Sequence, residues 1–320
     1  MKNYIATYFF HDCQDLGASY GNIFLPLTER NMIYWQTVYT LFFSAIVYNR
    51  DSEVSYVLFT NVESFPFRKD IEALGVKIYD NLTLTSRNSG QWATVRFFFD
   101  VIEYVRTNND FHDDDAIVML DTDVVTMKSA APLFEYLRDA KNAVVYVFDE
   151  VLDESQDFHG KNISNLEKIG LHAFGGLKKI KSLIGGELFG FEKNKISKFI
   201  SYFNHINSSN HSYQLTTEEQ ILTLVNAHRP WEVYPNAIYR IWTTLRVFDI
   251  PEERSQFIFV HLPSEKVAGL NNLFKGTINI DPRSITEQDF FLLFYRYIPL
   301  GRPYVLYLTK VAEKFWRYFK

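Results

Sequence analysis

The sequence predicts an α/β protein built on a mostly parallel β-sheet that helices cover on both faces. Short apolar runs of strand length alternate along the chain with longer segments whose apolar residues recur at helical spacing. The strand candidates are apolar throughout, as strands buried on both faces are. The 320 residues are 47% hydrophobic, which is ample for a large core, and they contain no internal repeat or low-complexity linker.

The elements of the first 130 residues follow from local patterns. The candidate strands are β-rich, and Gly75 closes a short candidate helix between two of them. We expect strands at 4–10, 54–61, 76–80 and 116–127, and helices at 31–49, 67–75 and 90–108.

The remaining elements are predicted in the same way. Residues 142–150 form an apolar strand that ends on acids, and 151–182 read as a mobile loop region with a little helix. A glycine-punctuated strand and a helix follow within 183–206. Thr216 or Thr217 caps the next helix, and a late strand ends at His261. We therefore expect one α/β domain over residues 1–266 and a helical extension over 267–320.

Composition excludes several classes of protein. With 33 basic and 38 acidic residues the formal net charge is −5, which argues against a nucleic-acid partner. One cysteine allows neither an internal disulfide nor a paired-cysteine metal site. The first residues reach His11 and Asp12 too soon for a secretory signal, and no run of ~18 apolar residues spans a membrane. We expect a cytoplasmic protein.

The stretch AIVMLDTDVVTM, residues 116–127, carries the clearest chemical signal. Strand alternation sends Asp121 and Asp123 to the same side, at the carboxyl end of a strand, where ligands of parallel sheets bind. Two such carboxylates repel one another, so a cation is expected, and Mg²⁺ and Mn²⁺ prefer oxygen ligands. A turn capped by aspartates is the alternative. The second D-x-D, residues 113–115, precedes the strand in a polar loop and is expected to be solvated.

At this motif the chain resembles the GT-A glycosyltransferases that use nucleotide-sugar donors. The resemblance spans residues 4–266 and includes QWATVRFFFDVI, VMLDTDVV, GGELFGF and TTEEQILTLVN in that order. It is nearest to the retaining galactosyl- and glucosyltransferases, among them the blood-group-type and glycogenin-like branches. The resemblance implies a GT-A, Rossmann-like fold in which Asp123 binds Mn²⁺ and Asp121 lies near the metal or the donor ribose.

The resemblance also implies which carboxylates lie near the anomeric carbon. GGELFGF would form a wall of the sugar site and supply Glu187, while TTEEQILTLVN would supply Glu218 and Glu219. Such a carboxylate can stabilise an oxocarbenium-like transition state, attack as a nucleophile or deprotonate the acceptor. The alternatives are helix-start acids matched to the helix dipole and, for Glu187, a loop carboxylate.

A late histidine and lysine continue the resemblance in part. His261 matches a strand-end metal ligand of the retaining relatives, and Lys266 could neutralise the departing diphosphate. The tryptophan of the family pattern is missing and the spacing differs. A hydrogen-bonded structural histidine and a solvated lysine are the alternatives.

Three further residues are candidates for donor contacts. The segment after the first strand lies where relatives hold the nucleotide base, so His11 or Tyr20 could stack on or border uracil. Arg96 lies on a helix that lines the donor pocket in relatives, and its planar fork suits phosphate or a pair of sugar hydroxyls. An ordinary loop, and an ion pair between Arg96 and Asp100, are the alternatives.

The sequence thus predicts a metal-dependent hexosyltransferase of polysaccharide biosynthesis. It would move a hexose from a UDP-sugar to a hydroxyl of a cell-surface glycan or glycolipid, with retention. Residues 291–320 hold six basic residues against one acid and many aromatics, so they could contact an anionic membrane at its inner face, or pack as a helix on the domain. The alternatives are a nucleotidyltransferase acting on sugar phosphates and a non-catalytic nucleotide-sugar-binding protein.

Overall fold

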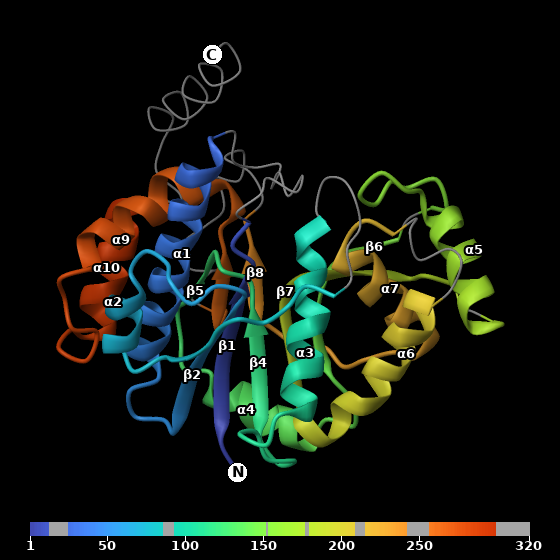
Figure 1. Cartoon of the computed structure of the whole chain (residues 1–320), viewed down its shortest axis with the longest axis horizontal. Coiled ribbons are helices and arrows are strands. Elements are labelled where there is room, and N and C mark those ends of the chain that lie inside the picture. The colour runs from blue at the N-terminus through green and yellow to red at the C-terminus, as the bar shows by residue number, and fades with distance from the viewer. Residues whose placement is uncertain are drawn as a thin grey trace.

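The computed structural model describes residues 1–12, 25–85, 93–151, 153–176, 179–208, 215–241 and 256–298. A six-stranded sheet with the order β3-β2-β1-β4-β7-β6 forms its centre (Figure 1). The strands are β1 (Asn3–Phe9), β2 (Val54–Thr60), β3 (Lys77–Tyr79), β4 (Ala116–Leu120), β6 (Val144–Glu150) and β7 (Ser182–Glu192). The first four are parallel, and β7 is antiparallel to both β4 and β6.

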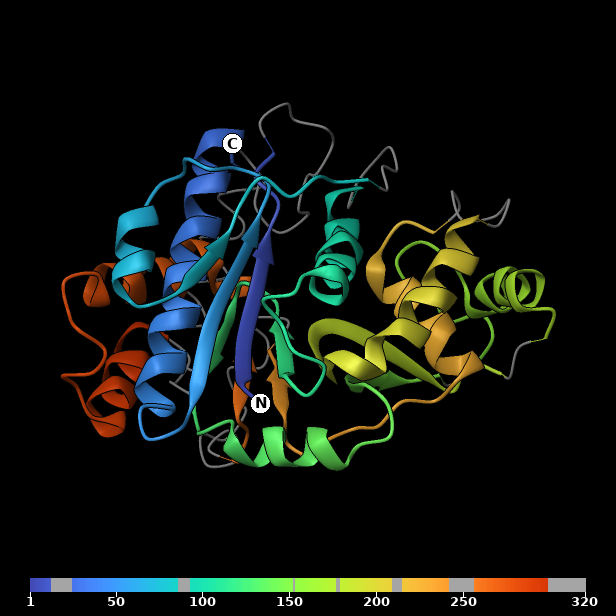
Figure 2. The same cartoon turned by 60° about the horizontal axis from the view of Figure 1, so that its bottom comes forward.

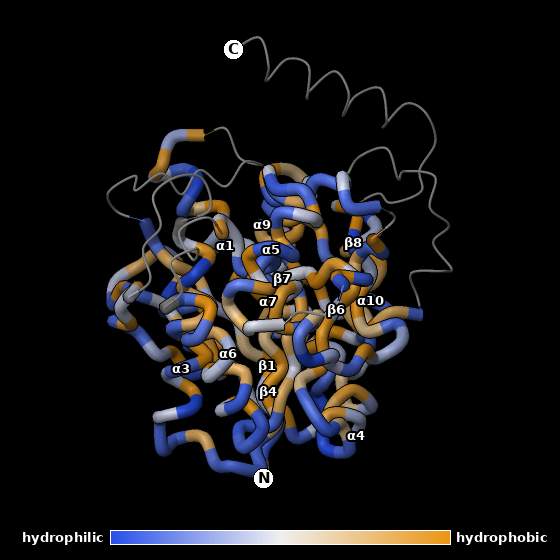
Figure 3. The backbone as a smooth tube through the Cα atoms, turned by 90° about the vertical axis from the view of Figure 1, so that its right-hand side faces the viewer, coloured by the Kyte–Doolittle hydropathy of each residue, from blue (hydrophilic) through white to orange (hydrophobic). Residues whose placement is uncertain are grey.

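Helices cover both faces of this sheet, as the sequence predicts. They are α1 (Leu27–Tyr48), α2 (Arg68–Ala73), α3 (Phe97–Thr107), α4 (Ala131–Asp139), α5 (Ile163–Phe174), α6 (Ile196–Ser208) and α7 (Glu218–His228). Alternate residues of β1 enter two separate cores: Ile5 packs with α1, and Tyr4 packs with α3. Figure 2 shows α1 and α3 on opposite sides of β1. The interior strands β1 and β4 are apolar, whereas many outer loops are hydrophilic (Figure 3).

A second, three-stranded sheet lies beside α1. It has the order β5-β9-β8, formed by β5 (Val124–Thr126), β8 (Ile238–Arg240) and β9 (Phe259–His261). The Ser44 hydroxyl of α1 accepts a hydrogen bond from the Thr126 N–H at 3.0 Å, so the helix holds the edge of this sheet. Residues 116–127 therefore form two strands in two sheets, where the sequence predicts one.

The break between β4 and β5 has a local cause. Aspartate is disfavoured in strands, and the Asp121 side chain accepts a hydrogen bond from the next N–H, that of Thr122, at 2.7 Å. This short-range bond turns the chain out of the first sheet. The predicted late strand ending at His261 and the cap at Thr217 are confirmed, since Thr217 and Gln220 form a capping box.

Two further sequence expectations need correction. The region 151–182, expected to be a mobile loop with a little helix, contains the twelve-residue helix α5, whose Asn162 side chain caps its first turn and whose Ile163, Leu166 and Ile169 are buried. Asp115, expected to be solvated, is fully buried and accepts hydrogen bonds from the N–H groups of Lys2 and His112 at 2.7 and 2.8 Å. Its carboxylate fixes the start of the chain, whereas Asp113 and Asp114 are exposed.

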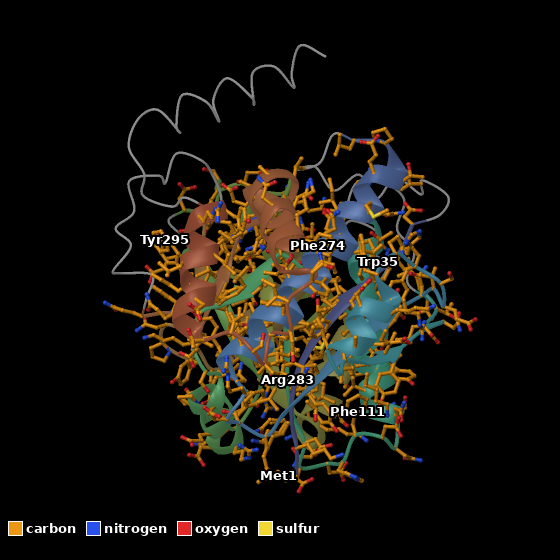
Figure 4. The ribbon with its side chains drawn as sticks, turned by 90° about the vertical axis from the view of Figure 1, so that its left-hand side faces the viewer. Met1, Trp35, Phe111, Phe274, Arg283 and Tyr295 are labelled. Carbon is orange, nitrogen blue, oxygen red and sulfur yellow. The ribbon has the colours of Figure 1, made fainter. Side chains whose placement is uncertain are left out.

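Two helices beyond residue 266 pack on α1. They are α9 (Asn271–Thr277) and α10 (Glu287–Tyr297). Phe274 meets Tyr39 of α1 edge-on at a ring-centroid distance of 5.3 Å, and Figure 4 labels Phe274 on the same side of the molecule as Trp35 of α1. The basic, aromatic end of the predicted extension, residues 299–320, lies outside the described residues. None of the described helices combines the length and the apolar composition needed to cross a membrane.

Phe43 tests the packing of α1 against α10. Its side chain is fully buried, and its ring lies 5.9 Å from that of Phe290. Phe43→Ala is expected to lower the free energy of unfolding by about 3–5 kcal/mol because it leaves a cavity. Leu171→Ala, at a helical position that is 52% exposed, is the matched control and should change it by less than about 0.5 kcal/mol in urea titrations. Equal effects of the two substitutions would contradict this packing.

Candidate metal and sugar site

The segment Asp121-Thr122-Asp123 joins the two sheets. The Asp121 N–H donates to the Glu187 carbonyl oxygen of β7 at 3.1 Å, which extends the pairing of β4 with β7. The Leu262 N–H donates to the Asp123 carbonyl oxygen at 3.0 Å, which extends the pairing of β5 with β9. Backbone pairing therefore places Glu187 opposite Asp121, and it places His261 opposite Val124, the residue after Asp123.

His261 is held between three carboxylates. Its Nε2 lies 3.1 Å from Asp123 Oδ1 and 3.6 Å from Asp121 Oδ2, and its Nδ1 lies 3.2 Å from Glu187 Oε1. Burial lowers the pKa of His261, but the negative charges of these neighbours, Asp123 first, raise it well above its usual value. The carboxylates around His261 thus favour a positive charge at this position.

Asp123 is the most deeply buried member of the cluster. Its side chain is fully buried, and Lys266 Nζ lies 2.9 Å from Oδ2 while His261 faces Oδ1. Burial alone would raise the pKa of Asp123, but the positive charges of His261 and Lys266 hold it well below its usual range. Asp121, by contrast, is 40% exposed and faces the open side of the site.

The residues fit a divalent metal ion. Asp121, Asp123 and His261 each offer a ligand atom, and these atoms lie within 4.8 Å of one another. Two carboxylates and one imidazole suit Mn²⁺, which accepts both oxygen and nitrogen ligands. His261 directs Nε2 toward the aspartates and Nδ1 toward Glu187, the division of roles seen in metal-bound histidines whose second nitrogen donates to a carboxylate.

Arg240 is a site residue that the sequence reasoning missed. It ends β8 and pairs in register with His261 of β9. Its NH1 lies 2.8 Å from Glu187 Oε1, and its guanidinium lies 4.8 Å from the centre of the Phe148 ring. Burial raises the pKa of Glu187, but the charges of Arg240 and His261 lower it below its ordinary value. The contact of Arg240 with Glu187 depends on the pairing of β8 with β9, which the sequence does not predict.

Glu218 and Glu219 occupy the first turn of α7. Glu219 Oε1 accepts a hydrogen bond from the Gly186 N–H at 3.1 Å, and its Oε2 contacts His159 Nε2. Glu218 is half-buried, and burial together with the charge of Glu219 raises its pKa well above the usual value. A Cβ on Gly186 would lie 2.6 Å from Glu218 Oε1, so the glycine is what lets this carboxyl approach β7.

These residues open into one pocket. Its acidic lining consists of Asp121, Glu187, Glu218 and Glu219, next to His261 and Lys266. An aromatic part of the lining consists of Tyr8, Phe9, Phe10 and Tyr34. Two of the predicted metal ligands, Asp121 and His261, therefore share a pocket with the candidate catalytic carboxylates and Lys266, whereas the third, Asp123, is buried behind its wall.

Two residues predicted to contact the donor, His11 and Arg96, form hydrogen bonds with other groups of the protein. His11 Nδ1 accepts a hydrogen bond from Trp35 Nε1 at 3.0 Å, and burial lowers the pKa of His11. Arg96 is 2% exposed and donates to the Leu215 carbonyl oxygen at 2.8 Å, and burial lowers its pKa to about 10. Its helical neighbours Thr94 and Val95 line the pocket. Tyr20 lies outside the described residues.

Solved structures resemble this chain, although no protein-family model and no curated protein matches it. The structure of the bifunctional glycosyltransferase WbbM superposes with a TM-score of 0.54 at 10% sequence identity, over 91% of this chain and 51% of that one. The galactosyltransferase LgtC, in complex with donor and acceptor sugar analogues, superposes with a TM-score of 0.50 at 12% identity, over 92% of this chain and 96% of that one. The chain spans about half the length of WbbM.

These likenesses establish the fold. The chain has the GT-A glycosyltransferase fold, with a mostly parallel central sheet and flanking helices, which confirms the fold class expected from the sequence. The aspartate pair lies at the carboxyl end of a central strand of that fold.

Glu187→Gln tests the support of His261. The substitution removes the negative charge behind Nδ1 and is expected to weaken Mn²⁺ binding by about 10–100-fold. The control is Glu192→Gln, which alters another buried, ion-paired glutamate of β7, bonded to Lys195, and should leave Mn²⁺ affinity unchanged. Affinity is measured by titration calorimetry. Unaltered binding by the Glu187 variant would show that His261 does not depend on this carboxylate.

Proposed function

We propose that the protein is a metal-dependent hexosyltransferase that uses a UDP-sugar. The observation that carries the proposal is the shared pocket, which is lined by Asp121 and His261 of the Asp121–Asp123–His261 cluster together with Glu218 and Glu219, while Asp123 lies buried behind them. A metal cluster that can hold a diphosphate, next to carboxylates that can face a sugar, is the arrangement that transfer from a nucleotide sugar requires. The GT-A fold is consistent with it.

The leaving group is the nucleoside diphosphate. Asp121, Asp123 and His261 would hold Mn²⁺ or Mg²⁺, and a bound ion supplies Lewis-acid neutralisation of the diphosphate charge. Lys266 lines the same pocket and adds a positive charge next to Asp123. Tyr34, whose ring centre lies 5.1 Å from Lys266 Nζ, restricts where that charge can move.

The carboxylates of α7 act on the sugar. Glu219 carries its charge close to the position of the anomeric carbon and stabilises the positive charge that develops there. Glu218, with a raised pKa, keeps its proton and donates a hydrogen bond to a sugar hydroxyl. Glu187 is enclosed by Arg240 and His261, so it orients the metal ligand instead of attacking the sugar. The sequence resemblance to retaining enzymes supports retention of the anomeric configuration.

The donor nucleotide is proposed to lie along the aromatic lining beyond β1. Tyr8 and Phe10 line the pocket there and offer apolar surface to a base. His11, which is held by its hydrogen bond to Trp35, and Tyr20 are proposed to border uracil. Arg96, which is held by its hydrogen bond to the Leu215 carbonyl oxygen, is proposed to support the wall of the donor pocket.

The acceptor is proposed to be a glycan or glycolipid hydroxyl at the inner membrane face. Leu292 of α10 is 58% exposed, and Arg296 lies one turn further along the same helix. The helix also carries two exposed acids in its first turn, Glu287 and Asp289, so the positive charge of the proposed contact comes from Arg296 and from the five basic residues in the sequence of 299–320.

Asp121→Asn is expected to abolish the Mn²⁺-dependent binding of the donor. Wild-type protein should bind one sugar of a UDP-sugar panel only when Mn²⁺ is present, since two carboxylates are needed to hold the ion. Titration calorimetry gives the affinity, and NMR of the product's anomeric proton tests retention.

The matched control is Asp113→Asn, in the exposed second D-x-D, which should bind like wild type. If folded wild-type protein bound no donor, the glycosyltransferase assignment would be withdrawn. If Asp121→Asn bound the donor normally, the aspartate pair would not be the metal site.

Leu292→Glu tests the membrane surface. It replaces an exposed apolar side chain of α10 with a charge of the same sign as the lipid, so co-sedimentation with anionic vesicles should weaken roughly tenfold. Leu171→Glu makes the same change on α5, on the other side of the molecule in Figure 1, and should have no effect. Equal binding by both variants would exclude α10 from the lipid contact.

A further inference from the structure

A hairpin between β6 and α5 places a histidine in the pocket. Asp157 and Asn162 pair as an antiparallel bridge, and the Phe158 N–H donates to the Lys161 carbonyl oxygen at 2.7 Å. The two residues at the tip, His159 and Gly160, both have positive φ, 54° and 79°, as a type I′ turn requires. His159 lines the pocket from this tip.

The identity of the residue at position 159 is not explained by the turn. Positive φ is strained for residues with a bulky side chain, and asparagine or glycine is the usual first central residue of a type I′ turn. Histidine tolerates this conformation better than most residues, so the turn permits it without requiring it. The contacts of its side chain, which adjoins the pocket, therefore decide what the residue does.

The turn is anchored to the start of α7. The Gln220 side-chain N–H₂ donates to the carbonyl oxygens of Phe158 and His159 at 2.9 and 3.3 Å, and Gln220 is also the N3 residue of the capping box. Phe158 is 3% exposed and packs in the core on the α3 side of the sheet. The tip of the hairpin is therefore fixed relative to the helical turn that carries Glu219.

Groups from three elements orient the Glu219 carboxylate. The Gly186 N–H of β7 donates to Oε1 at 3.1 Å, and His159 Nε2 contacts Oε2. Arg240 NH1 of β8 lies 3.8 Å from Oε1. The histidine contact is the one that holds the second oxygen, so without it the carboxylate could turn about its last side-chain bond.

We propose that His159 is a positioning residue of sugar transfer, which acts by holding the Glu219 carboxylate in the orientation that faces the anomeric carbon. This inference rests on the proposed function. The histidine itself need not exchange a proton with the substrate. Its effect is to fix the charge that stabilises the transition state, so it should act on kcat more than on donor affinity.

The test compares two substitutions at position 159. His159→Asn favours the turn conformation, but its amide is too short to reach Glu219, whereas His159→Gln places an amide N–H near the position of Nε2. His159→Asn should lower kcat on the order of 100-fold while KM for the donor changes less than about threefold. His159→Gln should restore kcat to within roughly tenfold of wild type. Thermal unfolding checks that both variants are folded.

A double-mutant cycle identifies the partner. In a Glu219→Gln background, His159→Asn should produce no further loss of kcat, because its effect passes through Glu219. An additive loss, or a kcat of His159→Asn equal to that of an active wild type, would overturn this inference alone. Absence of transfer by folded wild-type protein with every donor would overturn the proposed function and this inference with it.

Discussion

The burial of the Asp123 charge is the constraint on which the rest of the site depends. A carboxylate with no exposed surface is costly unless cations and hydrogen bonds compensate it. Here His261 and Lys266 compensate it, and they come from the far end of the chain through the pairing of β5 with β9. The second sheet therefore completes the site, because it brings His261 and Lys266 to Asp123 although they follow it in the sequence by 138 and 143 positions.

The site consists of two connected parts. One is the Asp121–Asp123–His261 cluster, and the other is the Glu218–Glu219 pair at the start of α7. Glu187 and Arg240 lie between them, since Glu187 contacts His261 and Arg240 contacts Glu187 while lying 3.8 Å from Glu219. A change in charge at the cluster can thus reach the carboxylates through packed, buried groups, which links the two halves of the proposed reaction.

The sequence predicted the fold and part of the site for identifiable reasons. Asp121, Asp123 and His261 each follow a short apolar run, so strand-end position and chemistry pointed to them together. Arg240 and His159 carry no such local signal. The first depends on the register of β8 with β9, and the second on a type I′ turn in a segment that reads as loop. Asp115 was expected to be solvated because one of its two partners, Lys2, lies at the chain start, far away in sequence.

The proposed site would hold one metal ion between Asp121, Asp123 and His261. The most direct measurement is anomalous diffraction at the manganese edge from crystals grown with Mn²⁺ and UDP. We expect a single strong peak bonded to Asp121, Asp123 and His261 Nε2, with the diphosphate on its open side. A peak at other residues, or a nucleotide bound with no peak between the two aspartates, would contradict it.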